Sequence, residues 1–303
     1  MYFQQTIHDV ASCTDVGLHT GKRVRMTIRP APPDHGIVFV RVDLAGHPRI
    51  KACPEAVVAS KYATTLGQDG AMVGTVEHLL SAFGGLGIDN ALVELDGTEV
   101  PIMDGSAAPF VALIKAAGIR MQRRRRRFLV IKEPISVKDG EKEAALLPFG
   151  GFRVSYTIEF DHPLLSNQTY LLDFAQEIYE REIGPARTFG FLDEVEGMRA
   201  NGLALGGSLE NAVVVGAGRI LNEEGLRFPD EFVRHKILDA LGDLWLLGRP
   251  LVGQFRAFKA GHSLNHRLLR KVMAVARSWE VLEFPSRQHW REFMLGRSAA
   301  AMA

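Results

Sequence analysis

The sequence contains little cysteine and no long hydrophobic run. Its only cysteines are Cys13 and Cys53, which form no CxxC pair. A disulfide framework and a cysteine-rich zinc finger are therefore excluded, and a reducing compartment is indicated. No apolar run reaches the roughly 18 residues of a spanning helix, and the N-terminus lacks the pattern of a signal peptide. We expect a cytoplasmic protein without a transmembrane segment, for which peripheral membrane contact stays open.

An excess of charge of one sign is also missing. Lysine and arginine total 36 against 35 acidic residues, so no global field favours nucleic acid or an anionic membrane. The local exception is the unbroken arginine run 123–127. We interpret it as a solvated connection between domains, with a patch for nucleic acid or lipid phosphate as the alternative. We expect no nucleic-acid partner and a monomeric protein.

The length of the chain permits two domains of ordinary size. Both halves show strands first and helices afterwards. We predict a first domain over residues 1–122, a basic linker over 123–127 and a second domain over 128–303. Each would form a layer of sheet and helix. The small, apolar residues 295–303 are expected to be a disordered tail.

Local patterns predict individual elements. Alternating polarity over residues 24–42, interrupted by PAPPDHG, predicts a hairpin with a long turn. A helix is expected to have Thr75 as its N-cap and to stop at Gly84 and Gly85. The segment NALVELDG then predicts a buried strand, followed by a second helix that ends at Gly118.

The segment 229–248 predicts a helix with three titratable residues on one side. His235, Asp239 and Asp243 follow each other at i, i+4 spacing and span about 80° of arc. Most other positions are apolar, so these groups would be partly buried, where unpaired charges are unfavourable. A metal ion is one solution. The alternative is a histidine and a carboxylate that only hydrogen-bond each other.

A second site strengthens the metal interpretation. Glu77 and His78 fall in the first turn of the helix predicted after Thr75, and metallohydrolases combine such groups as ligand and base. Together, His78, His235 and Asp239 offer two nitrogens and one oxygen, the set of a catalytic zinc site with a free position for water. Iron(II) could fill the same site. With no second cluster visible, we expect one metal ion per chain.

His262 follows Gly261 in a tight loop predicted after the strand GQFRAF. A lone histidine in a loop is usually only solvent-exposed. If the loop folds over the helix 229–248, Asp243 could orient the imidazole and favour its charged form, which would supply a general acid.

Long motifs now give a specific resemblance. They are VGLHTG at 16–21, TVEHLLSAFGGLGIDN at 75–90, PIMDGSAAPF at 101–110, ARTFGF at 186–191, LGGSLENAVV at 205–214, LNEEGLRFPDEFVRHKILDALGD at 221–243 and KAGHSLN at 259–265. Nearly end to end, the chain resembles the UDP-3-O-acyl-N-acetylglucosamine deacetylases, which catalyse the committed step of lipid A synthesis in Gram-negative bacteria. The resemblance implies an α+β fold of two α/β domains, each with a small insert, packed with their helices between the two sheets.

The resemblance also implies site residues. For catalysis they are zinc ligands His78, His235 and Asp239, general base Glu77, general acid His262 backed by Asp243, and oxyanion donor Thr188. For the substrate they are Glu159 and Phe160 at the uracil, Lys142, Lys236 and Lys259 at the diphosphate and sugar, Gly207, Ser208, Ala212 and Val214 along a passage for the acyl chain, and Phe189 and His19 as further contacts.

Two positions depart from the family pattern. Ala63, preceded by Tyr62, stands where many relatives have cysteine, and Asp15 stands where glycine is common. These changes leave the zinc chemistry intact, while ligand contacts near Ala63 stay open.

Other functions fit the sequence less well than the deacetylase. A zinc amidohydrolase for another N-acyl substrate would not need Phe160, Lys142 or the glycine-rich segment. A nucleic-acid-binding protein is disfavoured by the balanced charge, and a catalytically silent regulator by the full set of ligands, acid and base.

Overall fold

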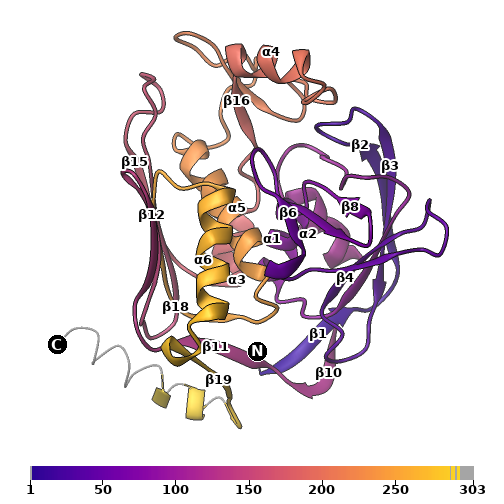
Figure 1. Cartoon of the computed structure of the whole chain (residues 1–303), viewed down its shortest axis with the longest axis vertical. Helices are drawn as coiled ribbons and strands as arrows, with labels where there is room; N and C mark the ends of the chain where they lie inside the picture. The colour runs from indigo at the N-terminus through magenta and orange to yellow at the C-terminus, as the bar shows by residue number, and fades with distance from the viewer. Residues whose placement is uncertain (1, 287, 291, 294–303) are drawn as a thin grey trace.

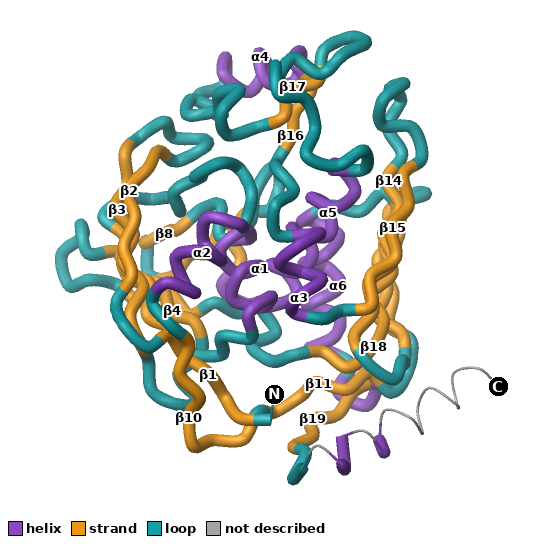
Figure 2. The backbone as a smooth tube through the Cα atoms, turned by 180° about the vertical axis from the view of Figure 1, so that it is seen from behind, coloured by secondary structure: helices purple, strands orange, loops and turns teal. Residues whose placement is uncertain are grey.

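Two sheets face each other across a central layer of helices (Figures 1 and 2). This computed structural model describes residues 2–286, 288–290 and 292–293. The mixed sheets and interposed helices confirm the expected α+β fold. The predicted tail 295–303 lies outside the described residues.

The sheet of the first half has a strand inserted where a hairpin was expected. Its order is β2 (Ala11–Val16), β3 (Arg23–Pro30), β9 (Ala91–Leu95), β4 (Ile37–Arg41) and β5 (Arg49–Lys51). The predicted hairpin over 24–42 is therefore wrong, because β3 and β4 each pair with β9 and not with each other. Ala91, Val93 and Leu95 of β9 are fully buried, so this strand belongs in the middle of the sheet.

Smaller elements complete the first half. Beside this sheet lie η1 (Pro54–Ala56) and a three-stranded sheet of β6 (Val57–Ala59), β7 (Thr65–Gln68) and β8 (Ala71–Val73). The N-terminal β1 (Phe3–Ile7) pairs antiparallel with β10 (Ile119–Arg125). The first half of the chain therefore begins and ends on one two-stranded ribbon.

The arginine run lies at the end of β10 and the start of β11 (Arg127–Ile131), not in a loop. Arg124 and Arg127 form ion pairs of 3.0 and 2.9 Å with Asp34, and Arg126 forms one of 2.6 Å with Asp89. Arg126 is buried. The expectation of a solvated run is wrong for this residue, because carboxylates of the first half neutralise the repulsion among the arginines. The domain boundaries themselves stay predictions.

The second sheet has the order β12 (Ile135–Asp139), β13 (Lys142–Leu147), β18 (Leu251–Phe258), β11 and β19 (Trp279–Glu283). In addition, β14 (Phe152–Ile158) pairs with β18, and β15 (Gln168–Asp173) pairs with β14. At the top of Figure 2, β16 (Phe189–Phe191), α4 (Leu192–Ala200) and β17 (Val213–Val215) form a small unit. Short connecting turns are α3 (Gln176–Ile178), η2 (Tyr179–Ile183) and η3 (Ala276–Ser278).

The central layer consists of α1 (Glu77–Leu86), α2 (Ala108–Ala116), α5 (Glu231–Trp245) and α6 (His262–Ala274). Helix α1 passes through Gly84 and Gly85 and ends at Gly87, whose φ of 70° suits glycine, so the predicted stop is wrong. Thr75 does not cap α1 either, because its hydroxyl donates to Glu99. None of the described helices is both long and apolar enough to cross a bilayer.

Candidate active site

The crossing of α1 and α5 positions the first group of side chains. Gly242 of α5 faces the first turn of α1, where a Cβ atom would lie 2.7 Å from the carbonyl carbon of Glu77 and 2.9 Å from its Cα. Only a glycine permits so close an approach of the two backbones. The approach brings His78 of α1 beside His235 and Asp239, which lie one turn apart on α5.

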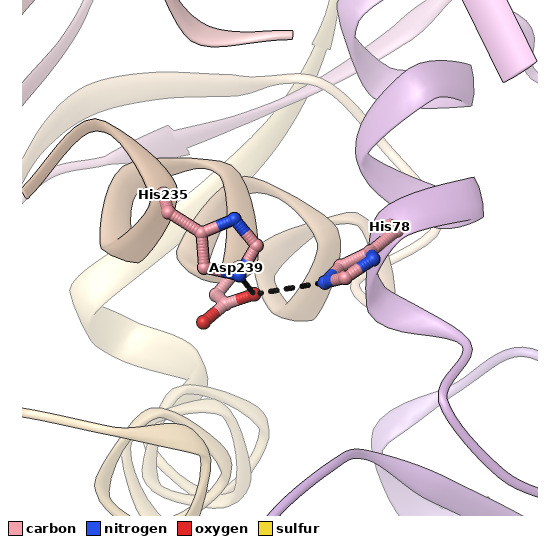
Figure 3. Close-up of side chains that lie close together, drawn as sticks. All are labelled: His78, His235 and Asp239. Atoms are coloured by element: carbon pink, nitrogen blue, oxygen red, sulfur yellow. Dashed lines mark ion pairs between the residues drawn. The ribbon is translucent and has the colours of Figure 1, made fainter. Parts of the chain in front are cut away.

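His78, His235 and Asp239 converge on one point (Figure 3). The Oδ1 atom of Asp239 lies 3.5 Å from Nε2 of His78 and 3.3 Å from Nε2 of His235. All three side chains are buried, and one ligand atom from each lies within 4.8 Å of the others. The predicted set is thus brought together in space, with geometry that could hold a metal ion.

The protonation of these groups suits the same role. Nδ1 of His235 lies 3.0 Å from the carbonyl oxygen of Ala186, which places the proton there and leaves the Nε2 lone pair facing Asp239. Burial lowers the pKa of His235 to about 4, so the ring is neutral near pH 7. Asp239 Oδ1 is buried and has no hydrogen-bond partner among the described residues. A cation would satisfy this oxygen.

The other oxygen of Asp239 is already paired. Lys236, half-buried on the same helix, donates from Nζ to Asp239 Oδ2 over 2.7 Å. Burial acts to raise the pKa of Asp239, but neighbouring positive charges, those of Lys236 and His262 among them, outweigh it and hold this pKa well below its usual range. Asp239 is therefore a carboxylate that directs one oxygen to Lys236 and the other to the two histidines.

Glu77 and His262 flank this set. Nε2 of His262 lies 3.7 Å from Oε1 of Glu77 and 3.8 Å from Oδ2 of Asp239. His262 is the first residue of α6, so the predicted loop is instead a helix start. Its Nδ1 lies 2.9 Å from Asp243 Oδ2, the partner expected from the sequence.

The charges of this pair are set by the surrounding groups. Burial alone would lower the pKa of His262, but the carboxylates of Asp243 and Glu77 raise it to about 9. Burial raises the pKa of Glu77. A protonated imidazole and a buried carboxyl group thus lie on one side of the three converging side chains, as a proton donor and acceptor would.

Three neighbours of Asp243 were missed in the sequence. Thr64, Asn265 and His266 all lie within hydrogen-bonding reach of its carboxylate. Asp243, His262 and His266 also form a second group with converging ligand atoms, so the expectation of a single cluster is wrong. The i, i+4 spacing of the two histidines was the available signal. Unlike Asp239, Asp243 has both oxygens occupied by donors of the protein.

A cavity of about 740 Å³ opens beside these groups. This volume suits a ligand the size of a substrate. The sequence-predicted residues that line it are Glu77, His78, Lys142, Glu159, Phe160, Thr188, Phe189, His235, Lys236, Asp239, Lys259 and His262. Residues from both halves of the chain therefore share one cavity.

Aromatic and charged groups lie around the cavity in distinct places. The rings of Phe160 and Phe189 meet edge to face at 5.9 Å. Lys259 forms ion pairs with Glu141 and Glu159, at 3.2 and 3.1 Å. The side-chain hydroxyl of Thr188 shows no hydrogen bond within the described part of the chain, while Tyr62 and Ala63 also line the wall.

Six predicted residues lie outside this lining: Asp243, which is buried behind His262, and His19, Gly207, Ser208, Ala212 and Val214. The His19 ring lies 6.5 Å from that of Tyr62, and neither ring nitrogen has a partner among the described residues. Gly207 lies near Leu18, which does line the cavity. Val214 belongs to β17, which pairs with β16 beside Phe189.

The chain is similar to known proteins over nearly its whole length. The sequence profile described as UDP-3-O-acyl N-acetylglycosamine deacetylase matches residues 4–274. The chain is 57% identical over 303 residues to the UDP-3-O-acyl-N-acetylglucosamine deacetylase of Myxococcus xanthus (strain DK1622), covering 100% of this chain and 96% of that protein. It is 51% identical over 284 residues to the protein of the same name from Syntrophus aciditrophicus (strain SB), covering 94% and 90%.

Proposed function

The chain belongs to the UDP-3-O-acyl-N-acetylglucosamine deacetylase family, and on this premise we propose that it uses a zinc ion to catalyse the family reaction. The reaction hydrolyses the N-acetyl group of UDP-3-O-acyl-N-acetylglucosamine, giving acetate and a free amine in lipid A synthesis. The observation that carries the proposal is the convergence of three candidate ligands, Glu77 and His262 on one cavity.

His78, His235 and Asp239 would hold the metal ion. Two imidazole nitrogens and one carboxylate oxygen match a catalytic zinc site, and the unpaired Oδ1 of Asp239 supports this use. Iron(II) is an alternative occupant of the same donors. When bound, the ion would acidify a water molecule and polarise the acetamide carbonyl.

Glu77 and His262 would move the protons. Glu77 accepts a proton from the attacking water, which is the role of its buried carboxylate. His262, protonated through its pairing with Asp243, then donates from Nε2 to the leaving amine nitrogen. Thr188, whose hydroxyl is free of partners within the described residues, would donate to the oxyanion, a contribution worth roughly 3–4 kcal/mol for a positioned donor.

The remaining cavity residues would bind the substrate. Phe160 offers a ring for the uracil, with Glu159 and Phe189 beside it. Lys142 and Lys259 present ammonium groups to the diphosphate. Lys236 would contact the sugar next to its pairing with Asp239.

The acyl chain would leave the cavity through a passage formed by other residues. We place it along the segment that contains Gly207, Ser208, Ala212 and Val214, with His19 nearby. The small unit of β16, α4 and β17 carries this segment. We also propose that the enzyme works in the cytoplasm as a monomer.

Mass spectrometry of the purified protein incubated with UDP-3-O-acyl-N-acetylglucosamine tests the function. Loss of the acetyl group is expected in the metal-replete sample, to be abolished by a chelator and restored by added zinc. Comparing zinc with iron(II) in the restoration step identifies the more active metal. An unchanged substrate with every metal would refute the proposal.

A further inference from the structure

The hydroxyl of Thr64 lies at the centre of a buried hydrogen-bond cluster. Its Oγ1 atom is 2.6 Å from Asp243 Oδ1 and 2.8 Å from Nε2 of His266. All three residues are buried. Because these side chains contact each other directly, the direction of each hydrogen bond follows from which of their atoms carry a proton.

One direction is fixed by the carboxylate. Burial acts to raise the pKa of Asp243, but the charge of His262 outweighs it and holds this pKa below its usual range, so Asp243 can only accept. Thr64 has one hydroxyl proton, which it donates to Asp243. Its lone pair must therefore accept from His266, which requires the proton of His266 to be on Nε2.

The opposite tautomer of His266 would break this cluster. An Nε2 lone pair would compete for the Thr64 proton and would face Asp243 Oδ1 at 3.3 Å. Nδ1 of His266 is buried with no hydrogen-bond partner among the described residues, so no nearby acceptor draws the proton to that nitrogen. The surroundings thus select the Nε2–H form.

The cluster ends at both proton-transfer groups. Asp243 Oδ2 faces His262 Nδ1 at 2.9 Å, and Asn265 supports the same oxygen over 2.9 Å. With its proton fixed on Nδ1, the His262 ring presents Nε2 to Glu77. The backbone N–H of Thr64 also donates to Glu77 Oε2 over 3.0 Å. Thr64 therefore contacts both Asp243, which orients His262, and the carboxylate of Glu77.

We propose that His266 is a positioning residue for catalysis, which acts through Thr64 and Asp243 to hold the His262 imidazole in its productive orientation. The inference rests on the proposed role of His262 as proton donor. His266 lies one helical turn beyond His262 on α6, so the same helix supplies the donor and the group that orients it.

Two substitutions at His266 separate positioning from packing. His266→Leu removes the donor and keeps an apolar side chain, and should lower kcat by roughly 10- to 100-fold while KM and bound metal stay at wild-type levels. His266→Gln places an amide N–H near the position of Nε2 and should restore most of the loss. Circular dichroism and elemental analysis verify folding and metal content.

Thr64→Val is the matched variant at the other end of the hydrogen bond. It preserves side-chain volume and the backbone N–H to Glu77, and it should reproduce the loss in kcat. If His266→Leu fails to fold, Thr64→Val tests the same link. A wild-type kcat in a folded Thr64→Val protein would overturn the inference.

A double-mutant cycle with His262→Gln tests the path. If His266 acts through His262, then His266→Leu has no further effect on kcat once His262 is replaced. If His266→Leu lowers kcat by its full factor in the His262→Gln background, the inference about His266 is overturned but the role of His262 is not. The same holds if His266→Gln lowers kcat as much as His266→Leu does. A wild-type kcat for His262→Gln itself would instead refute the proposed proton donor.

Discussion

Replacing Gly242 with alanine tests whether the close approach of α1 and α5 builds the metal site. The added Cβ would lie 2.7 Å from the carbonyl carbon of Glu77, whereas ordinary contacts begin near 3.4 Å. The contacted atoms are backbone, so the helices must separate, by about 1 Å if they relieve the overlap as rigid bodies. His78 moves with α1, away from His235 and Asp239.

Two opposing terms set the expected change in stability. Overpacking of a core typically lowers the free energy of unfolding by about 1–3 kcal/mol. Alanine recovers up to about 1 kcal/mol because it is a better helix former than glycine. We expect a net loss of roughly 1–2 kcal/mol. The effect on the metal should be larger, because ligand distances are held within roughly 0.2 Å.

Chemical denaturation and chelator competition measure the two effects separately. Gly242→Ala should weaken metal affinity by at least about tenfold. Gly197→Ala is the matched control, since Gly197 lies within α4 and a Cβ there meets nothing within 4 Å. It should gain up to about 1 kcal/mol of stability without any change in metal affinity. Wild-type metal affinity in Gly242→Ala would refute this account of the helix crossing.

Four further outcomes are expected. His235→Ala should lose the metal, and a full content by elemental analysis would remove His235 from the ligand set. Glu77→Gln and His262→Gln should keep the metal but lose roughly 10²- to 10⁴-fold in kcat. The alkaline limb of the pH profile of kcat should flatten or shift only in His262→Gln. An unchanged alkaline limb in that variant would contradict the proton-donor role of His262. In metal-free protein, the pKa of His262 rises on folding from 6.5 to about 9. Its contribution to the free energy of unfolding is therefore complete below pH 6.5 and is lost as pH rises through about 9. Urea titrations should show this loss of stability between pH 6.5 and 9 in the wild type but not in His262→Gln. Gly207→Phe should reduce kcat/KM far more for long-chain than for short-chain substrates, and equal losses would place the acyl passage elsewhere.

The fold was predictable where the sequence carries a local pattern. The helix around His235 and Asp239 follows from i, i+4 spacing and its apolar positions, and the structure has it over Glu231–Trp245. The expected hairpin failed for a non-local reason. A turn sequence between two strands indicates only that the chain reverses, and cannot show that β9 enters between them.

The site was predictable in its residues but not in its connections. The residue types suggested that His78 could join the two ligands of α5, since two imidazoles and one carboxylate make a catalytic zinc set, and the family resemblance selected that set. The contact of Gly242 with Glu77 depends on the crossing of two helices, for which neither segment has a signal of its own. Thr64 was missed because a hydroxyl in a short loop acquires its meaning only from partners on α5 and α6.

The ribbon of β1 and β10 has a bearing on how the protein is synthesised. Once residue 125 has left the ribosome, β1 has its partner and the first half can close on itself. At that stage the nascent chain holds His78 but neither His235 nor Asp239, so it has one of the three converging side chains. Tight capture of the ion must wait until α5 has emerged and packed on α1. The metal would then bind late in synthesis, and its ligands would link α5 of the second half to α1 of the first half.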